Sequence, residues 1–121
     1  MEKMTFKTFV WPQNPHTYKE TLKREPVYYK DEDGAYIFEG LSPVKREITG
    51  SGVFLGETAY EDFRRLLALV DQPTAGDLQH PIWGIRVCYL TELELLQESK
   101  TDCVSYRFTF TGADANGEIP M

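Results

Sequence analysis

Strict alternation of apolar and polar residues near the C-terminus is the feature that most constrains the fold of this chain. Over residues 103–111 every second side chain is apolar, at Val104, Tyr106, Phe108 and Phe110. Successive side chains of a β-strand point to opposite faces, so this segment predicts a strand with one face buried. Further strands are expected over residues 4–10, 21–29, 35–38, 44–56 and 85–96, with a turn over 97–102.

An acidic, glycine-ended run separates two of these expected strands. Residues 31–34 read Asp-Glu-Asp-Gly, and such residues supply the local hydrogen bonds and the positive φ that a chain reversal requires. The run has the beginning of a calcium-binding loop, but the position of the closing glutamate is occupied by Ser42. We therefore interpret it as the solvated turn of a β-hairpin. In the strand over 44–56, Gly50 and Gly52 indicate a bulge or a close approach of backbone.

One segment has helical periodicity. Thr58 and Glu61 fit a capping box, in which each side chain satisfies an exposed amide of the first turn. The apolar residues that follow recur at spacings of three and four: Tyr60, Phe63, Leu66, Leu67 and Val70. The pattern predicts a helix over about residues 58–71, with this stripe packed on a sheet.

Together these elements predict a mainly β (α+β) fold, an antiparallel β-sandwich or half-barrel with one flanking helix. A chain of 121 residues can build one core but not two. We expect one domain over residues 1–112 and a flexible C-terminal tail over 113–121.

Charge and hydropathy exclude several classes of protein. The net charge of −6 argues against a nucleic-acid partner, because such proteins concentrate basic residues. No apolar run approaches the roughly 20 residues that a membrane helix needs, and residues 1–7 lack the apolar region of a signal peptide. For the same reason we expect no membrane partner. Because the chain has only two cysteines, it cannot form a disulfide framework, and we expect a reduced, cytosolic setting.

Residues that could carry catalysis or bind a metal are scarce. Both histidines, His16 and His80, lie next to a proline, and no nucleophile motif or phosphate-binding loop accompanies them. Cys88 and Cys103 are too far apart to form a zinc-binding pair. We therefore expect no catalytic residues, no cofactor and no metal, and a protein that is not an enzyme.

A compact turn motif follows the predicted helix, at Gly76, Leu78, His80, Pro81 and Gly84. Gly76 suits a reversal after the helix, and Leu78 suits an anchor in the core. Pro81 prevents further pairing, and Gly84 lets the chain enter the next strand. For His80 we expect hydrogen bonds to the backbone of the turn.

The order of these segments resembles that of a known family. The segments are TGSGVFLG at 49–56, AYEDFRRLLALV at 59–70, GDLQHPIWG at 76–84 and VSYRFTF at 104–110. In this order they resemble the N-terminal domain of the DNA-circularisation proteins and related baseplate and tail-hub proteins of contractile phage tails and prophage-derived injection machines. The resemblance extends over roughly residues 40–111, and its most specific part is the turn motif that follows the helix.

The resemblance implies a tail-tube-like fold and a structural role in a phage or prophage tail or baseplate. The expected partners are other tail or baseplate proteins, with copies of itself in a ring as one option, in the bacterial cytoplasm during assembly and then in the virion tail. We expect the loop over residues 11–18 to contact a partner, with Trp11 and Tyr18 as interface residues. Of the neighbouring residues Tyr28 and Tyr29, one is expected to point inward to the core and the other outward. The alternative is a small β-barrel that binds a ligand, or acts on one, in its mouth.

Overall fold

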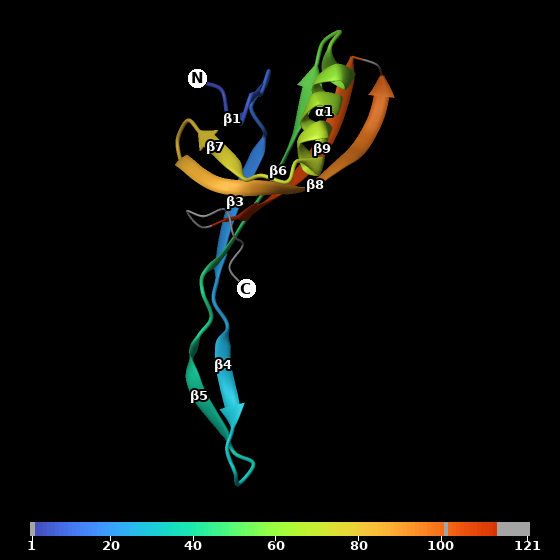
Figure 1. The fold of residues 1–121 in the computed structure, drawn as a ribbon. Helices are drawn as coiled ribbons and strands as arrows, with labels where there is room; N and C mark the ends of the chain where they lie inside the picture. Colours follow the sequence, from blue (N-terminus) through green and yellow to red (C-terminus); the bar gives the residue numbers. More distant parts are fainter. Residues whose placement is uncertain (1, 101, 114–121) are drawn as a thin grey trace.

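The computed structural model of the protein describes residues 2–100 and 102–113. Within these residues, seven strands form one antiparallel sheet in the order β2-β1-β7-β8-β9-β6-β3 (Figure 1). The strands are β1 (Thr5–Phe6), β2 (Phe9–Val10), β3 (Thr17–Lys23), β6 (Lys45–Leu55), β7 (Gly76–His80), β8 (Gly84–Lys100) and β9 (Cys103–Gly112). Two further strands, β4 (Pro26–Lys30) and β5 (Tyr36–Leu41), form a separate two-stranded sheet. Of the expected tail, residues 114–121 lie outside the described residues.

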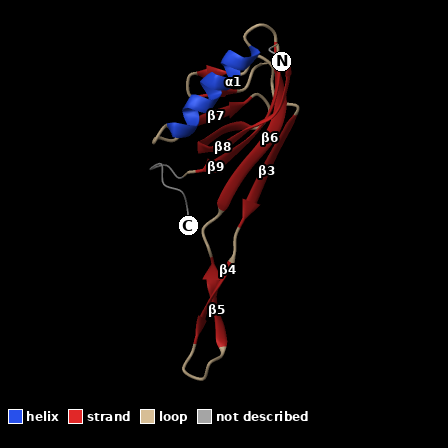
Figure 2. Cartoon of the chain, turned by 90° about the vertical axis from the view of Figure 1, so that its right-hand side faces the viewer, coloured by secondary structure: helices blue, strands red, loops and turns tan. Residues whose placement is uncertain are grey.

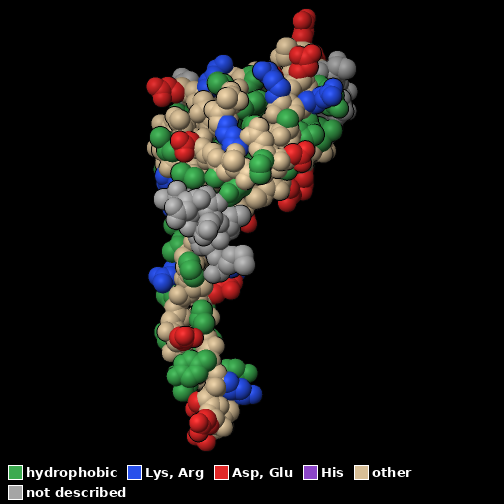
Figure 3. All heavy atoms as spheres, in the orientation of Figure 1, with side chains coloured by type: hydrophobic (Ala, Val, Ile, Leu, Met, Phe, Trp, Pro, Cys, Tyr) green, Lys and Arg blue, Asp and Glu red, His purple; other side chains and the backbone are tan. Residues whose placement is uncertain are grey.

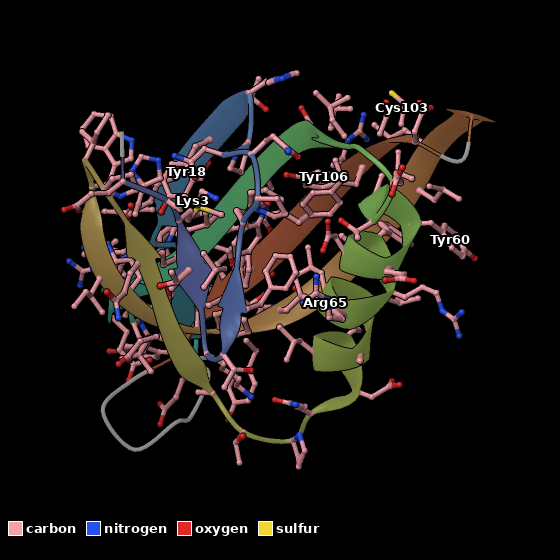
Figure 4. The ribbon with its side chains drawn as sticks, turned by 90° about the horizontal axis from the view of Figure 1, so that it is seen from above. Lys3, Tyr18, Tyr60, Arg65, Cys103 and Tyr106 are labelled. Carbon is pink, nitrogen blue, oxygen red and sulfur yellow. The ribbon has the colours of Figure 1, made fainter. Side chains whose placement is uncertain are left out.

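The predicted fold class is confirmed, and the seven-stranded sheet has the form of an open half-barrel. The sheet curls until residues of β1 and β9 meet, although two strands separate them in the sheet order. The rings of Phe6 and Phe110 have centroids 4.8 Å apart. Tyr106 lies inside this curl, as Figure 4 shows from above. All four alternating side chains of β9 are fully buried, as the sequence predicted.

Two predicted strands and one predicted turn differ from the observed structure. Residues 4–10 form the hairpin β1–β2, because the backbone turns at Lys7, which has φ 53°. The expected strand over 21–29 is interrupted between β3 and β4. The expected turn over 97–102 is shorter, because β8 continues to pair with β9 as far as Lys100 opposite Cys103.

Close backbone packing explains two glycines of β6. A Cβ atom at Gly50 would collide with the carbonyl oxygen of Thr17 and with the ring of Phe108. A Cβ atom at Gly52 would lie 2.7 Å from the hydroxyl oxygen of Tyr106. The expected close approach is therefore confirmed, and neighbouring strands and core rings fill the space that side chains would need.

The predicted helix is present as α1 (Ala59–Ala68), followed by the 3-10 turn η1 (Leu69–Asp71). Its buried face differs from the predicted stripe. Phe63 and Leu66 are buried as expected, but Tyr60 and Leu67 are exposed at 41% and 43%. Figure 4 shows Tyr60 pointing away from the sheet. Ala59, Asp62 and Leu69 complete the buried face in their place, so the helix is rotated about its axis relative to the predicted stripe.

The predicted capping box does not form. Thr58 is the N-cap residue, but its side chain makes no hydrogen bond to the backbone of the first turn. Its hydroxyl instead donates to Asp62 Oδ2 at 3.1 Å. Asp62 is 2% exposed and forms an ion pair with Arg65. The threonine thus helps to satisfy a buried carboxylate, which would otherwise carry a desolvation cost.

Within the described residues, no helix has the length and apolar content needed to cross a membrane.

Candidate functional site

The most conspicuous feature of the surface is the hairpin β4–β5, here called the arm (residues 26–41). Asp31 Oδ1 accepts hydrogen bonds from the backbone N–H groups of Asp33 and Ala35, at 3.0 and 2.9 Å. Gly34 adopts φ 84°, which costs glycine little. The acidic turn therefore closes a hairpin, as predicted from the sequence. Figure 2 shows the arm projecting away from the curled sheet and the helix.

The pairing within the arm distributes apolar side chains over both of its faces. Tyr28 lies opposite Phe38, with ring centroids 5.9 Å apart. Lys30 lies opposite Tyr36 on the same face, since residues two apart on a strand share a face, and its Nζ is 5.7 Å from the Tyr36 ring centroid. The opposite face carries the pair of Tyr29 and Ile37.

Every strand position of the arm except Gly40 is exposed. Figure 3 shows hydrophobic side chains along the arm. The large apolar side chains exposed on the arm are Val27, Tyr28, Tyr29, Tyr36, Ile37, Phe38 and Leu41. The expectation that Tyr28 and Tyr29 would divide into one inward and one outward residue is wrong, because both are about half exposed, at 55% and 50%. Their strand extends past the core, so neither face has a core to pack against.

An isolated two-stranded hairpin is marginally stable in water, and contiguous exposed apolar surface marks an interaction site. The arm therefore has the properties of a segment that binds to another protein.

The predicted turn motif forms the end of the hairpin β7–β8. Leu78 is fully buried, as expected for an anchor. His80 Nδ1 accepts hydrogen bonds from the backbone N–H groups of Ile82 and Trp83, at 3.0 and 3.2 Å. The backbone role expected for His80 is thus confirmed. Gly84 adopts φ 83° as the chain enters β8.

The two remaining members of the motif have simpler roles. Pro81 lies at the turn between β7 and β8, as expected. Gly76 does not adopt a positive φ. A Cβ atom there would collide with the aliphatic chain of Lys7, whose Nζ donates to the Thr74 carbonyl oxygen at 2.7 Å. Gly76 therefore makes room for a side chain that secures the β1–β2 hairpin.

The structure brings together two residues singled out in the sequence, Tyr18 and His80. Their ring centroids are 4.4 Å apart, although Tyr18 lies on the edge strand β3 and His80 on β7. Beside them, Glu20 Oε1 pairs with Arg46 Nε at 2.8 Å and with Arg86 Nε at 3.2 Å. These side chains connect β3 and β6 with β7 and β8, two pairs of strands that share no backbone pairing within the described residues.

Burial perturbs both rings at this junction. Desolvation, followed by the charge of Glu20, raises the pKa of Tyr18 to about 12. Desolvation lowers the pKa of His80. Both shifts favour the neutral form, and a neutral His80 is the form whose Nδ1 can accept hydrogen bonds from the turn.

A second apolar surface lies beside this junction. We call it the turn patch; it consists of Ile82, Trp83 and Ile85, which are 61%, 55% and 56% exposed. A hollow of about 220 Å³ opens between Trp83, Tyr18 and Glu20. The turn patch belongs to the body of the protein, whereas the arm extends away from it (Figures 1 and 2).

The expectation that Trp11 is an exposed interface residue is wrong. Trp11 is fully buried, and its Nε1 donates a hydrogen bond to Tyr106 Oη at 3.0 Å. The backbone N–H of Trp11 also donates to the Met4 carbonyl oxygen at 3.0 Å. Of the two predicted interface residues, only Tyr18 reaches the surface, and it is half-buried.

Sequence reasoning missed four exposed apolar residues that are candidates for an interface, namely Tyr36, Ile37, Phe38 and Trp83. A signal was present in the arm, because Tyr28-Tyr29 and Tyr36-Ile37-Phe38 are consecutive apolar residues on both sides of an acidic turn. A hairpin built from such runs has two apolar faces. For Trp83 no comparable signal was present, because the turn motif was interpreted only as a structural turn and not as an exposed apolar surface.

Among the described residues, no three His, Cys, Asp or Glu side chains lie close enough together to hold a metal ion. Cys88 is buried, and desolvation raises the pKa of its thiol to about 12, so it remains protonated at neutral pH.

Solved structures resemble this fold. A chain in the virion of a native gene transfer agent particle matches with a TM-score of 0.52 and 18% sequence identity, covering 84% of this chain and 81% of that chain. A chain in the tail of an empty gene transfer agent particle, determined with C6 symmetry, matches with a TM-score of 0.52 and 17% identity, covering 84% and 78%. Among curated proteins there is no match.

At the level of sequence, the family described as the N-terminus of DNA circularisation proteins matches residues 5–87, which is more than half of the chain. The matched region extends from β1 into β8 and so includes the arm, the helix and the turn motif. The protein therefore belongs to the DNA circularisation protein N-terminus family.

Proposed function

We propose that this protein is a non-enzymatic structural component of a phage or prophage tail or baseplate, and that it works through protein–protein contacts. The observation that carries the proposal is the arm, whose apolar side chains are exposed on both faces. A two-stranded ribbon of this kind gains stability when another protein covers it. Exposed apolar surface of this kind is expected in a segment that another protein covers in an assembly, and it is unfavourable in a free monomer.

The comparisons support the tail as the place of assembly. The similar chains belong to a gene transfer agent virion and to the tail of such a particle. The partners we propose are other tail or baseplate proteins, including further copies of this chain in a ring. Assembly in the bacterial cytoplasm precedes incorporation into the virion tail, and the net charge of −6 helps the free chain stay soluble until then.

The interior of the half-barrel supports assembly over the alternative of a ligand site in a barrel mouth. Trp11, Phe54 and Tyr106 are fully buried and fill the curl with aromatic rings, and Phe54 stacks on Tyr106 with centroids 4.4 Å apart. Within the described residues, the edge strands β2 and β3 do not pair with each other. The curl thus has a packed core in the place where a small barrel would hold a ligand.

Electron microscopy of tails from a complemented deletion strain tests the proposal. Deletion of the gene should abolish normal tails, and the unchanged gene should restore them. A chain carrying Tyr28→Ser and Phe38→Ser should fold but fail to restore tails. Leu67→Gln, which removes a similarly exposed apolar side chain from α1, serves as the matched control and should restore them.

Two results would count against the proposal. Normal tails after complete deletion of the gene would reject the structural role. Normal tails with the doubly substituted arm would remove the arm from the interface.

A further inference from the structure

We propose that the arm of one copy of this chain docks on the turn patch of a second copy, with an aromatic side chain of the arm entering the hollow beside Trp83. This inference rests on the proposed function and names the surface that receives the arm. The contact joins two different surfaces, so it is a head-to-tail contact that can propagate around a ring or along a tube.

The geometry of a single chain leaves both surfaces uncovered. The arm projects away from the body (Figures 1 and 2), so it does not reach the turn patch of its own chain. Ile82 and Trp83 remain more than half exposed at the tip of the β7–β8 hairpin. A second copy brings an arm to this place without any change in the fold of either chain.

The exposed area of the arm is sufficient for a specific contact. Large aromatic side chains bury about 150–250 Å² each. With the exposed fractions of its seven large apolar side chains, the arm offers on the order of 700 Å². A specific interface takes about 800 Å² from each partner. Because the seven side chains lie on both faces of the arm, the face that docks supplies on the order of half of one side, and the acidic tip and the residues flanking the arm complete it.

The receiving surface matches the arm in size and chemistry. The hollow between Tyr18, Glu20 and Trp83 measures about 220 Å³, and a cavity of about 150 Å³ already holds a benzene ring. Its walls include two aromatic rings, which pair well with a third in edge or offset contact. Tyr28 and Tyr36, on the face of the arm that also carries Phe38, have rings of the required size.

The charges of the two surfaces are complementary. At the tip of the arm, Asp31, Glu32 and Asp33 follow one another, and Glu32 and Asp33 are exposed. At the junction beside the hollow, Arg46 and Arg86 share the carboxylate of Glu20, so these three side chains together carry one net positive charge. An acidic tip guided toward this junction brings the aromatic face of the arm to the turn patch, and added salt weakens the attraction.

A titration between two complementary variants tests this contact. The first chain, labelled with ¹⁵N, carries Tyr28→Ser and Phe38→Ser, so it keeps its turn patch but has a disabled arm. The second chain, unlabelled, carries Trp83→Ser, so it keeps its arm but has a disabled patch. In the mixture only one pairing is possible, between the second chain's arm and the first chain's patch.

The two tryptophans of the chain supply the readout and its internal control. Upon titration we expect a saturable shift of the Trp83 indole N–H signal, which decreases in high salt. The signal of Trp11, buried against Tyr106, should not move. An unlabelled chain that carries all three substitutions should produce no shift.

The absence of any shift at Trp83 up to millimolar concentrations would overturn the inference, and so would an equal shift with the triply substituted chain. This failure is distinct from failure of the proposed function. If deletion and arm substitution still abolish tails while the titration shows no shift, the arm binds a different tail protein.

Discussion

The indole of Trp11 donates a hydrogen bond to the hydroxyl of Tyr106 at 3.0 Å, inside the core and across 95 positions of sequence. This bond ties the segment that leaves β2 to the interior strand β9. Both side chains are fully buried. Burial raises the pKa of Tyr106, so its hydroxyl stays protonated and available to Trp11.

Substitutions at Trp11 should therefore destabilise the fold. Trp11→Phe should lower the free energy of unfolding by about 2–4 kcal/mol, because it leaves a cavity and an unpaired buried hydroxyl. Trp11→Glu should prevent folding, because it buries a charge. Chemical denaturation measures both, with Trp83→Phe as an exposed control expected to change stability by less than about 0.5 kcal/mol. Native stability of Trp11→Glu would place the side chain at the surface.

The helix offers a second matched pair. Leu66 is fully buried and its neighbour Leu67 is 43% exposed. Leu66→Ala should lower the free energy of unfolding by about 2–5 kcal/mol, the usual cost of emptying a core position. Leu67→Ala should cost less than about 0.5 kcal/mol. Equal losses for the two variants in urea denaturation would contradict the observed rotation of α1.

Partial burial of the His80 ring predicts a dependence of stability on pH, because desolvation lowers the pKa of His80. Because the pKa of His80 is lowered in the folded chain, the unfolded chain binds more protons as the pH falls below about 6.5. The contribution of His80 to stability should be complete above that pH and decline as the pH falls through its folded pKa.

Asparagine supplies the control for this effect, because its side-chain oxygen accepts similar local backbone hydrogen bonds without titrating. At pH 8 the His80→Asn variant should be nearly as stable as the unchanged protein. When the pH is lowered from 7 to 5, the free energy of unfolding of this variant should fall by less than that of the unchanged protein. His80→Ala should be less stable at every pH. Parallel pH profiles for the unchanged protein and His80→Asn would show that His80 does not carry this dependence.

Local sequence patterns were sufficient to predict the elements in which apolar residues recur at a regular spacing. The alternation ending at Phe110 predicted a half-buried strand, and the spacing of Phe63 and Leu66 predicted a helix on a sheet. Each pattern arises because one face of the element is buried, and the burial of one face spaces apolar residues at regular intervals along the sequence. The exposure of Tyr60 shows the limit, because the rotation of a helix depends on the surface beneath it.

The wrong predictions concern residues whose environment is set by contacts with residues distant in the sequence. The prolines that follow Trp11, at positions 12 and 15, indicated an exposed loop. The burial of Trp11 instead depends on Tyr106, which is distant in the sequence. Lys7 adopts a positive φ without a glycine signal, held there by hydrogen bonds to residues near Thr74. For Tyr28 and Tyr29 the alternation rule assumed a core on one side, and the arm has none.

Amide hydrogen exchange of the arm, measured in the free chain and in purified tails, tests the central claim most directly. In the free chain the amides of β4 and β5 should exchange far faster than those of β9, since two exposed strands open easily. In tails the arm amides should become protected by at least about tenfold, while those of β9 stay slow in both states. Arm amides that exchange equally fast in free chains and in tails would contradict the claim that the arm is covered in the assembly.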